Sequence, residues 1–270
     1  MIRFWPTTSF DLGCLLLAAG CLFASQVQAC AKRLRWHDDP PYSMRLPDGR
    51  IGGWSVELTQ AVLQRMGCSL ELEEMPFARA LIELKAGRID LLDGAFALPE
   101  RQAYAHFSKP VMRSRNLVFI RSKDLPRFRE QSLVELHREG WRFGAQVGVA
   151  YGASFAALQQ DPSFLSALQL VPRRASLWKM LALGRLDVVI ADELTASYEL
   201  AQAKLETQIS ATSLVVSSEP APMAFSKVTV DLAFVQRYDA ILQTMQADGS
   251  FERLRQRYGL KSMDDTPPKR

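Results

Sequence analysis

Two aspartates stand at positions where a charged group of a ligand could be held. Asp93 follows the largely apolar segment RIDLL at 88–92, and Asp192 follows RLDVVIA at 185–191. Each segment predicts a buried strand, and open α/β sheets bind ligands at the carboxyl ends of their strands. A carboxylate at such an end can bind an ammonium group, and a pair of carboxylates could also act as general acid and base.

The rest of the chain carries none of the motifs that mark common enzyme classes. There is no Gly-x-Ser-x-Gly elbow and no His-Glu-x-x-His zinc helix. The three histidines, His37, His106 and His137, are scattered, and no Cys/His cluster has the spacing of metal ligands. We therefore expect no catalysis, no metal and no cofactor.

The elements that must position the two aspartates occur twice along the chain. Gly-Arg-aliphatic-Asp begins at Gly87 and again at Gly184, each time after a predicted helix (77–87 and 176–184) and before a predicted strand. The glycines fit left-handed helix ends, and we expect Asp90 and Asp187 to be structural residues at strand starts. Residues 32–96 predict strand, helix, strand, helix, strand, and the α/β pattern restarts after 114–122, which indicates two α/β lobes.

The N-terminal segment predicts export. A short apolar run at 12–24 is too short to span a bilayer, and it is followed by Val27-Gln28-Ala29, which fits signal-peptidase cleavage after Ala29. We predict a signal peptide at 1–29 and a periplasmic protein. The alternatives are a lipoprotein anchored at Cys21 and a membrane-retained helix; nothing after residue 30 is long and apolar enough to span a membrane.

Cleavage after Ala29 leaves two cysteines in a compartment where disulfides persist. Cys30 precedes the first predicted strand and Cys68 precedes the second, with a helix between them. The starts of neighbouring parallel strands lie at the same edge of a sheet, so a Cys30–Cys68 disulfide is geometrically reasonable. The alternative is two unrelated thiols.

The charge balance does not favour a nucleic-acid partner. The 270 residues include 33 basic and 29 acidic ones, for a net charge of +4, and the basic residues are spread along the chain.

Six stretches together resemble the extracellular solute-binding proteins of family 3, the group best known for amino-acid ABC importers. They run through almost the whole mature chain in the family's order: DDPPYS (38–43), GGWSVELTQAVLQRMG (52–67), ALIELKAGRIDLLDGAFALPER (80–101), FSKP (107–110), GRLDVVIADE (184–193) and DGSFERLRQRYG (248–259). Each stretch alone is a weak signal, and their combination is specific.

The resemblance implies an α/β periplasmic-binding-protein fold of type II. Each lobe would be a mainly parallel sheet flanked by helices, with a two-strand hinge between lobe 1 (31–117 plus 217–270) and lobe 2 (118–216). A solute would sit between the lobes, which close on it. The implied partners are a small-molecule ligand and the permease and ATPase of an ABC importer, with the binding protein itself a monomer.

The resemblance also assigns candidate ligand contacts. Arg101, after the Pro-Glu step, would bind a ligand carboxylate through its guanidinium fork. Asp192 would bind the ligand ammonium, and it could equally cap the following helix. Tyr42 and Trp54 would be aromatic pocket walls or lobe-core residues. Arg79 would be an extra base near the cleft, or a residue that forms a salt bridge on the helix face.

Several positions depart from the family's amino-acid binders. Ser and Thr hydroxyls usual in the pocket are replaced, at positions that include Asp93, Phe96 and Tyr151. Asp93 could even neutralise Arg101. Backbone N–H groups around Tyr151, between Gly148 and Gly152, could hold an anion, although an ordinary glycine turn also explains them. These departures favour a bulkier or flatter ligand than a simple polar amino acid, and leave open an orphan sensing module or a cleft enzyme such as a dehydratase.

Overall fold

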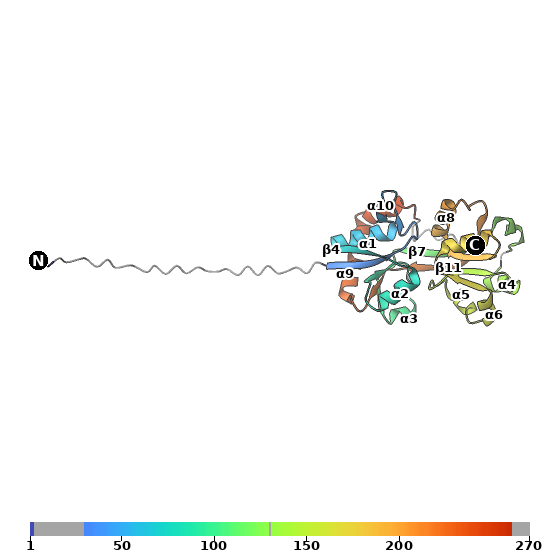
Figure 1. Cartoon of the computed structure of the whole chain (residues 1–270), viewed down its shortest axis with the longest axis horizontal. Coiled ribbons are helices and arrows are strands. Elements are labelled where there is room, and N and C mark those ends of the chain that lie inside the picture. Colours follow the sequence, from blue (N-terminus) through green and yellow to red (C-terminus); the bar gives the residue numbers. More distant parts are fainter. Residues whose placement is uncertain (3–29, 130, 261–270) are drawn as a thin grey trace.

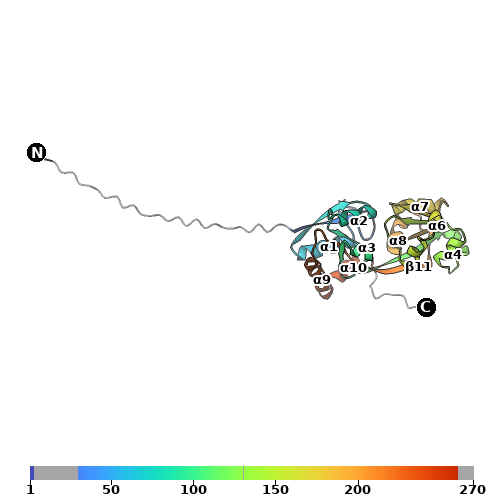
Figure 2. The same ribbon diagram turned by 90° about the horizontal axis from the view of Figure 1, so that it is seen from below.

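The protein consists of two lobes joined by two long strands. The computed structural model describes residues 1–2, 30–129 and 131–260. In two perpendicular views the lobes lie side by side, and β7 (Met112–Arg121) and β11 (Ile209–Ala221) run between them (Figures 1 and 2). The predicted signal peptide and the alternative lipid site at Cys21 lie outside the described residues, apart from residues 1–2. No helix in the described ranges is both long and apolar enough to cross a membrane.

Lobe 1 is built on a five-stranded sheet of order β4-β1-β5-β12-β6. Its strands are β1 (Cys30–Trp36), β4 (Cys68–Glu74), β5 (Leu91–Leu92), β6 (Ala105–Phe107) and β12 (Ala224–Ser226). Its helices are α1 (Trp54–Arg65), α2 (Phe77–Lys85), α3 (Pro99–Gln102), α9 (Leu232–Ala247) and α10 (Ser250–Arg257). A small hairpin, β2 (Met44–Arg45) with β3 (Ile51–Gly52), precedes α1.

Lobe 2 is built on a second five-stranded sheet of order β11-β7-β10-β8-β9. Besides β7 and β11 it contains β8 (Phe143–Gln146), β9 (Leu168–Val171) and β10 (Val188–Asp192). Its helices are a 3₁₀ turn, η1 (Ser122–Arg127), and α4 (Leu133–Arg138), α5 (Ala153–Leu158), α6 (Pro162–Ala167), α7 (Arg174–Ala182) and α8 (Glu193–Gln202).

Both sheets are mixed, whereas the sequence predicted mainly parallel ones. In lobe 1, β1 pairs in parallel with β4 and β5, but β12 is antiparallel to β5 and β6. In lobe 2, β8 is parallel to β9 and β10, but β7 is antiparallel to β10 and β11. The β7–β11 pair is antiparallel because the chain crosses between the lobes in β7 and returns in β11. The predicted lobe boundaries, 117/118 and 216/217, fall inside β7 and β11 and stay a prediction.

The hydrophobic spacing of α1 explains how lobe 1 packs. Leu58 and Val62, four residues apart on one face of the helix, are almost fully buried. They belong to the same core cluster as Leu34 of β1 and Phe225 of β12, which places α1 against the sheet.

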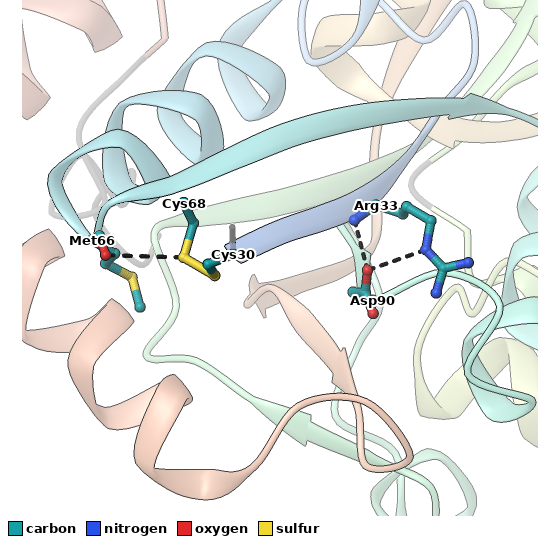
Figure 3. Close-up of a disulfide and its surroundings, with 5 residues drawn as sticks. All are labelled: Cys30, Arg33, Met66, Cys68 and Asp90. Atoms are coloured by element: carbon teal, nitrogen blue, oxygen red, sulfur yellow. Dashed lines mark hydrogen bonds and ion pairs between the residues drawn. A yellow bond between two sulfur atoms is a disulfide. The ribbon is translucent and has the colours of Figure 1, made fainter. Parts of the chain in front are cut away.

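The repeated Gly-Arg-aliphatic-Asp motif has a structural role in both lobes. In lobe 1, Asp90 Oδ2 accepts hydrogen bonds from the backbone N–H of Arg33 at 2.7 Å and from its Nε at 3.3 Å (Figure 3). In lobe 2, Asp187 accepts the equivalent bonds from Arg142, at 3.1 and 2.8 Å. Each arginine also donates to the carbonyl oxygen of the motif glycine, Gly87 or Gly184. The motif therefore fixes the segment before β5 to β1 in lobe 1, and the segment before β10 to the start of β8 in lobe 2.

The predicted disulfide is confirmed. Cys30 and Cys68 are directly opposite each other in the parallel register of β1 and β4, with 4.5 Å between their Cα atoms (Figure 3). The two cysteines are 38 positions apart in the sequence, and α1 lies between them. By the chain-entropy model such a crosslink contributes about 3–4 kcal/mol.

We expect reduction of this disulfide to lower the melting temperature by about 10 °C, because the reduced unfolded chain gains conformational freedom. The measurement is a thermal melt of the purified protein with and without reductant. The Cys30→Ala/Cys68→Ala double variant is the control, and its melting temperature should not respond to reductant. A wild-type melting temperature that is equally insensitive would contradict the prediction, as would two free thiols in non-reducing mass spectrometry.

Candidate functional site

A cavity of about 100 Å³ lies between the two lobes. Seven of the eight predicted contacts line it: Tyr42, Trp54, Asp93, Phe96, Arg101, Tyr151 and Asp192. Lobe 1 supplies the first five of these residues and lobe 2 supplies Tyr151 and Asp192. The fold therefore brings residues from both halves of the chain to one place, while their roles as ligand contacts stay a prediction.

Arg101 is a buried cation without an anionic partner among the described residues. It lies on the one-turn helix α3, is 6% exposed, and donates to the carbonyl oxygens of Phe96 at 3.3 Å and Gly148 at 3.1 Å. Burial lowers the pKa of its guanidinium, because desolvation disfavours the charge. A buried charge that is bonded only to neutral carbonyls is costly, so this site favours an incoming anion.

Asp192 provides the matching negative charge. It ends β10 and caps α8, where its Oδ1 accepts the backbone N–H groups of Leu194 at 3.2 Å and Thr195 at 3.1 Å. The hydroxyls of Tyr42 and Ser114 also donate to the carboxylate, each at 3.1 Å. All these donors are neutral, and burial raises the pKa of Asp192. The carboxylate is therefore a helix cap and, at the same time, an anion in the cavity wall without a cationic hydrogen-bond partner among the described residues.

Asp93 is paired differently from what its position in the sequence suggested. It follows β5, and its ion-pair partner is Arg35 of β1, with 3.8 Å between Asp93 Oδ1 and Arg35 Nη1, rather than Arg101. Burial raises the pKa of Asp93, and the nearby Arg35 charge only partly offsets that effect. Arg35 itself is 2% exposed and donates to the carbonyl of Met75. The pair makes the lobe-1 wall polar without adding net charge.

Aromatic side chains shape the remaining walls. Tyr42 follows the cis Pro40–Pro41 peptide, and its hydroxyl crosses the cavity to Asp192. Trp54, 1% exposed, packs edge-to-face on Phe251 at 5.1 Å between ring centroids, so it is both a core residue and a cavity wall. Tyr151 is also buried, and its hydroxyl accepts the backbone N–H of Gln146. These contacts fix the rings before any ligand arrives.

Arg79 is the predicted residue that the structure does not bring to the cavity. Its side chain is 61% exposed and forms an ion pair with Glu83 one turn later on α2, at 2.5 Å. Phe77, two residues earlier, faces the cavity, and two residues rotate a helix by about 200°. The helical phase of α2 therefore directs Arg79 away.

Three charged residues of the cavity wall were not predicted from the sequence as site residues: Arg35, Asp39 and Arg174. Arg35 alternates with the buried Leu34 and Trp36 in β1, a pattern that normally places such an arginine in solvent. Because β1 lies inside the sheet with both faces covered, Arg35 is buried as well. Arg174 follows the exposed Arg173, and nothing in the sequence distinguishes the two.

The cavity depends on a close approach of backbone between the lobes. Gly148 has φ +81°, and a Cβ added there would lie 3.0 Å from the Cα and Cβ of Ala78 in lobe 1. A side chain at this position would therefore hold the lobes apart.

We expect Gly148→Ala to weaken binding of any cavity ligand about tenfold or more, because closure would cost on the order of 1.4 kcal/mol extra. The measurement is calorimetric titration with a ligand that binds the wild type. Gly140→Ala is a matched control, since Gly140 has φ +78° and nothing within 4 Å of an added Cβ. An equal loss of ligand affinity in Gly148→Ala and Gly140→Ala would mean that backbone strain, and not impaired closure of the lobes, is responsible.

Comparison with known proteins identifies the family. Residues 35–261 match the model of the bacterial extracellular solute-binding proteins, family 3. The chain belongs to this family, and its fold is the two-lobe fold of periplasmic binding proteins.

Two curated relatives and one solved structure show what the chain resembles. It is 24% identical over 224 residues to the arginine-binding extracellular protein ArtP of Bacillus subtilis (strain 168), covering 82% of each chain. It is 25% identical over 227 residues to the L-cystine-binding protein TcyJ of Escherichia coli (strain K12), covering 81% of this chain and 78% of that protein. Its fold matches a mutant of ArgBP from T. maritima with a TM-score of 0.73 at 21% identity, covering 84% and 94%.

Proposed function

We propose that this protein captures a small zwitterionic amino acid, or a compound like one, in the cavity between its lobes. One observation carries the proposal: Arg101 and Asp192 are opposite charges in the same cavity, and neither has an ion-pair partner among the described residues. The other wall charges are already matched, Arg35 with Asp93 and Arg174 with Asp39. An α-carboxylate on Arg101 and an α-ammonium on Asp192 would balance the cavity.

The relatives support this ligand class. ArtP and TcyJ are described as binding arginine and L-cystine, which both carry the α-carboxylate and α-ammonium that the two residues would hold. We propose that the protein works in the periplasm as a monomer and delivers its ligand to the permease and ATPase of an ABC importer.

The test is a thermal-shift screen of the purified protein against amino acids, polyamines, small organic acids and peptidoglycan fragments. A ligand at 100 times its Kd should stabilise the protein by about 2.7 kcal/mol. Hits restricted to compounds with both charged groups would support the proposal. Hits among polyamines or organic acids alone would contradict it.

The same screen separates the alternative functions. A hit recovered chemically altered after incubation would indicate a cleft enzyme, for which the buried carboxyl groups of Asp93 and Asp192 would be the first candidates. A panel without hits would favour a sensing or partner-binding role over amino-acid import.

A further inference from the structure

A second space between the lobes adjoins the cavity. It is a groove of about 650 Å³, lined on the lobe-1 side by residues 37–40 and Glu74, and on the lobe-2 side mainly by α7 and α8. Three residues line both the groove and the cavity: Asp39, Gln146 and Arg174. These three side chains therefore form the partition that closes the cavity on this side.

Arg174 is held within lobe 2 by its own neighbours. It is buried, its Nε donates to Glu199 Oε2 at 2.9 Å, and its Nη1 donates to Gln146 Oε1 at 3.2 Å. Trp178 Nε1 in turn donates a hydrogen bond to Glu199 Oε2, with 2.5 Å between the two atoms. Its Nη2 donates to Glu199 Oε1 at 3.1 Å and is also the atom that meets lobe 1, so residues of lobe 2 hold the guanidinium in place.

Asp39 meets this guanidinium from lobe 1. Its backbone forms a turn with Tyr42 and Ser43, while its side chain forms an ion pair with Arg174 Nη2. The Asp39 carboxylate is 30% exposed, and the Arg174 side chain is 9% exposed. Away from the strands β7 and β11, this is the ion pair that joins the two lobes in the part of the chain that the structure describes.

We propose that Asp39 and Arg174 form an interlobe clasp, which holds the lobes together without a ligand and tightens binding through closure. Among the described residues, and away from β7 and β11, two further polar contacts join the lobes: Tyr42 with Asp192 and Arg101 with Gly148. Each of them involves a residue, Asp192 or Arg101, that the proposed function assigns to the ligand. The clasp uses neither Arg101 nor Asp192, so it can stay formed whether or not a ligand occupies them. Neutralising Asp39 removes the charge that Arg174 meets in lobe 1, and the loss falls only on the closed state, because the two residues are in contact only there.

The clasp is a pair of positioning residues, because it acts through the arrangement of the lobes. If the closed state is the one that binds, the apparent affinity falls in proportion to the closed fraction. We expect Asp39→Asn to lower the affinity for an amino acid that binds in the screen about tenfold or more. This expected loss of affinity rests on the proposed function. The expected change in the shape of the ligand-free protein does not.

The decisive experiment compares the shapes of ligand-free variants by small-angle X-ray scattering. Asp39→Asn is the main variant, because Arg174 keeps its partner Glu199 and lobe 2 stays intact; Arg174→Gln tests the same pair from the other side. The chain offers two matched controls, Asp38→Asn and Arg173→Gln, which make the same charge changes at adjacent exposed positions.

The expected result is a larger radius of gyration for Asp39→Asn and Arg174→Gln than for wild type and both controls. The double variant should be no more open than either single variant, because both remove one interaction. A ligand-free Asp39→Asn protein with the wild-type radius of gyration would overturn the clasp, as would equal opening in the controls. If the wild type binds no amino acid at all, the proposed function fails, and the shape comparison still decides the clasp.

Discussion

Arg101→Ala is expected to reduce the affinity for any carboxylate ligand by at least about 100-fold, because truncating one partner of a buried, hydrogen-bonded charge pair costs several kcal/mol. Arg101 is 6% exposed, and within residues 30–129 and 131–260 its guanidinium hydrogen-bonds only to the carbonyls of Phe96 and Gly148, so the ligand carboxylate would supply its counter-charge. Calorimetric titration with an amino acid from the screen measures the loss.

Two further variants make the Arg101 result specific. Arg101→Lys keeps the charge but loses the planar fork, and it should bind about tenfold more weakly than wild type. Arg79→Ala removes an exposed arginine outside the cavity and should bind as wild type does. Binding by Arg101→Ala within a factor of two of wild type would remove Arg101 from the site.

Asp192→Asn is expected to weaken the binding of zwitterionic amino acids by about 10- to 100-fold, because the ligand ammonium would lose its counter-charge. The substitution is nearly isosteric, and asparagine caps helices as well as aspartate does. The start of α8, where the side chain accepts two backbone N–H groups, should therefore stay intact. Titration of the variant and the wild type with the same amino acid gives the ratio of their dissociation constants.

A ligand analogue and pH provide the controls for Asp192. The deaminated analogue of the same amino acid should bind wild type and Asp192→Asn equally, since it carries no ammonium. Burial raises the pKa of Asp192 in the empty protein, and an ammonium ligand favours the ionised form. Wild-type affinity should accordingly fall as the pH drops through this raised pKa, and this decrease should be smaller in the variant. If the ratio of the affinity for the amino acid to the affinity for the analogue were the same in wild type and Asp192→Asn, Asp192 would be excluded as the ammonium partner.

Local sequence patterns were sufficient to predict several of the elements and the family. The helical spacing in 54–67 and the glycine ends at Gly87 and Gly184 are short-range features, and they correspond to α1 and to the ends of α2 and α7. The disulfide could also be predicted, because a strand–helix–strand unit places the starts of its parallel strands at one edge. Such features depend on residues that are close together in the chain, or on pairing rules shared by many folds.

The partners of the charged side chains were decided by the tertiary structure alone. Tyr42 and Asp192 are 150 residues apart in the chain, and Arg174 and Asp39 are 135 apart, so each pairing exists only because the two lobes face one another. Asp93 is paired with Arg35 rather than with Arg101 because the sheet places β1 beside β5.

The sequence by itself determined which residue types could reach the cavity, since strand ends, turns and helix starts place them near its edge. It did not determine which face of an element each side chain occupies. Arg79 points to solvent while Phe77 lines the cavity, and Arg173 is exposed while Arg174 is buried. From Phe77 to Arg79 the helix rotates by about 200°, and Arg173 is the extended residue that precedes α7. Only the packing of each helix against its lobe decides which of its side chains face the cavity.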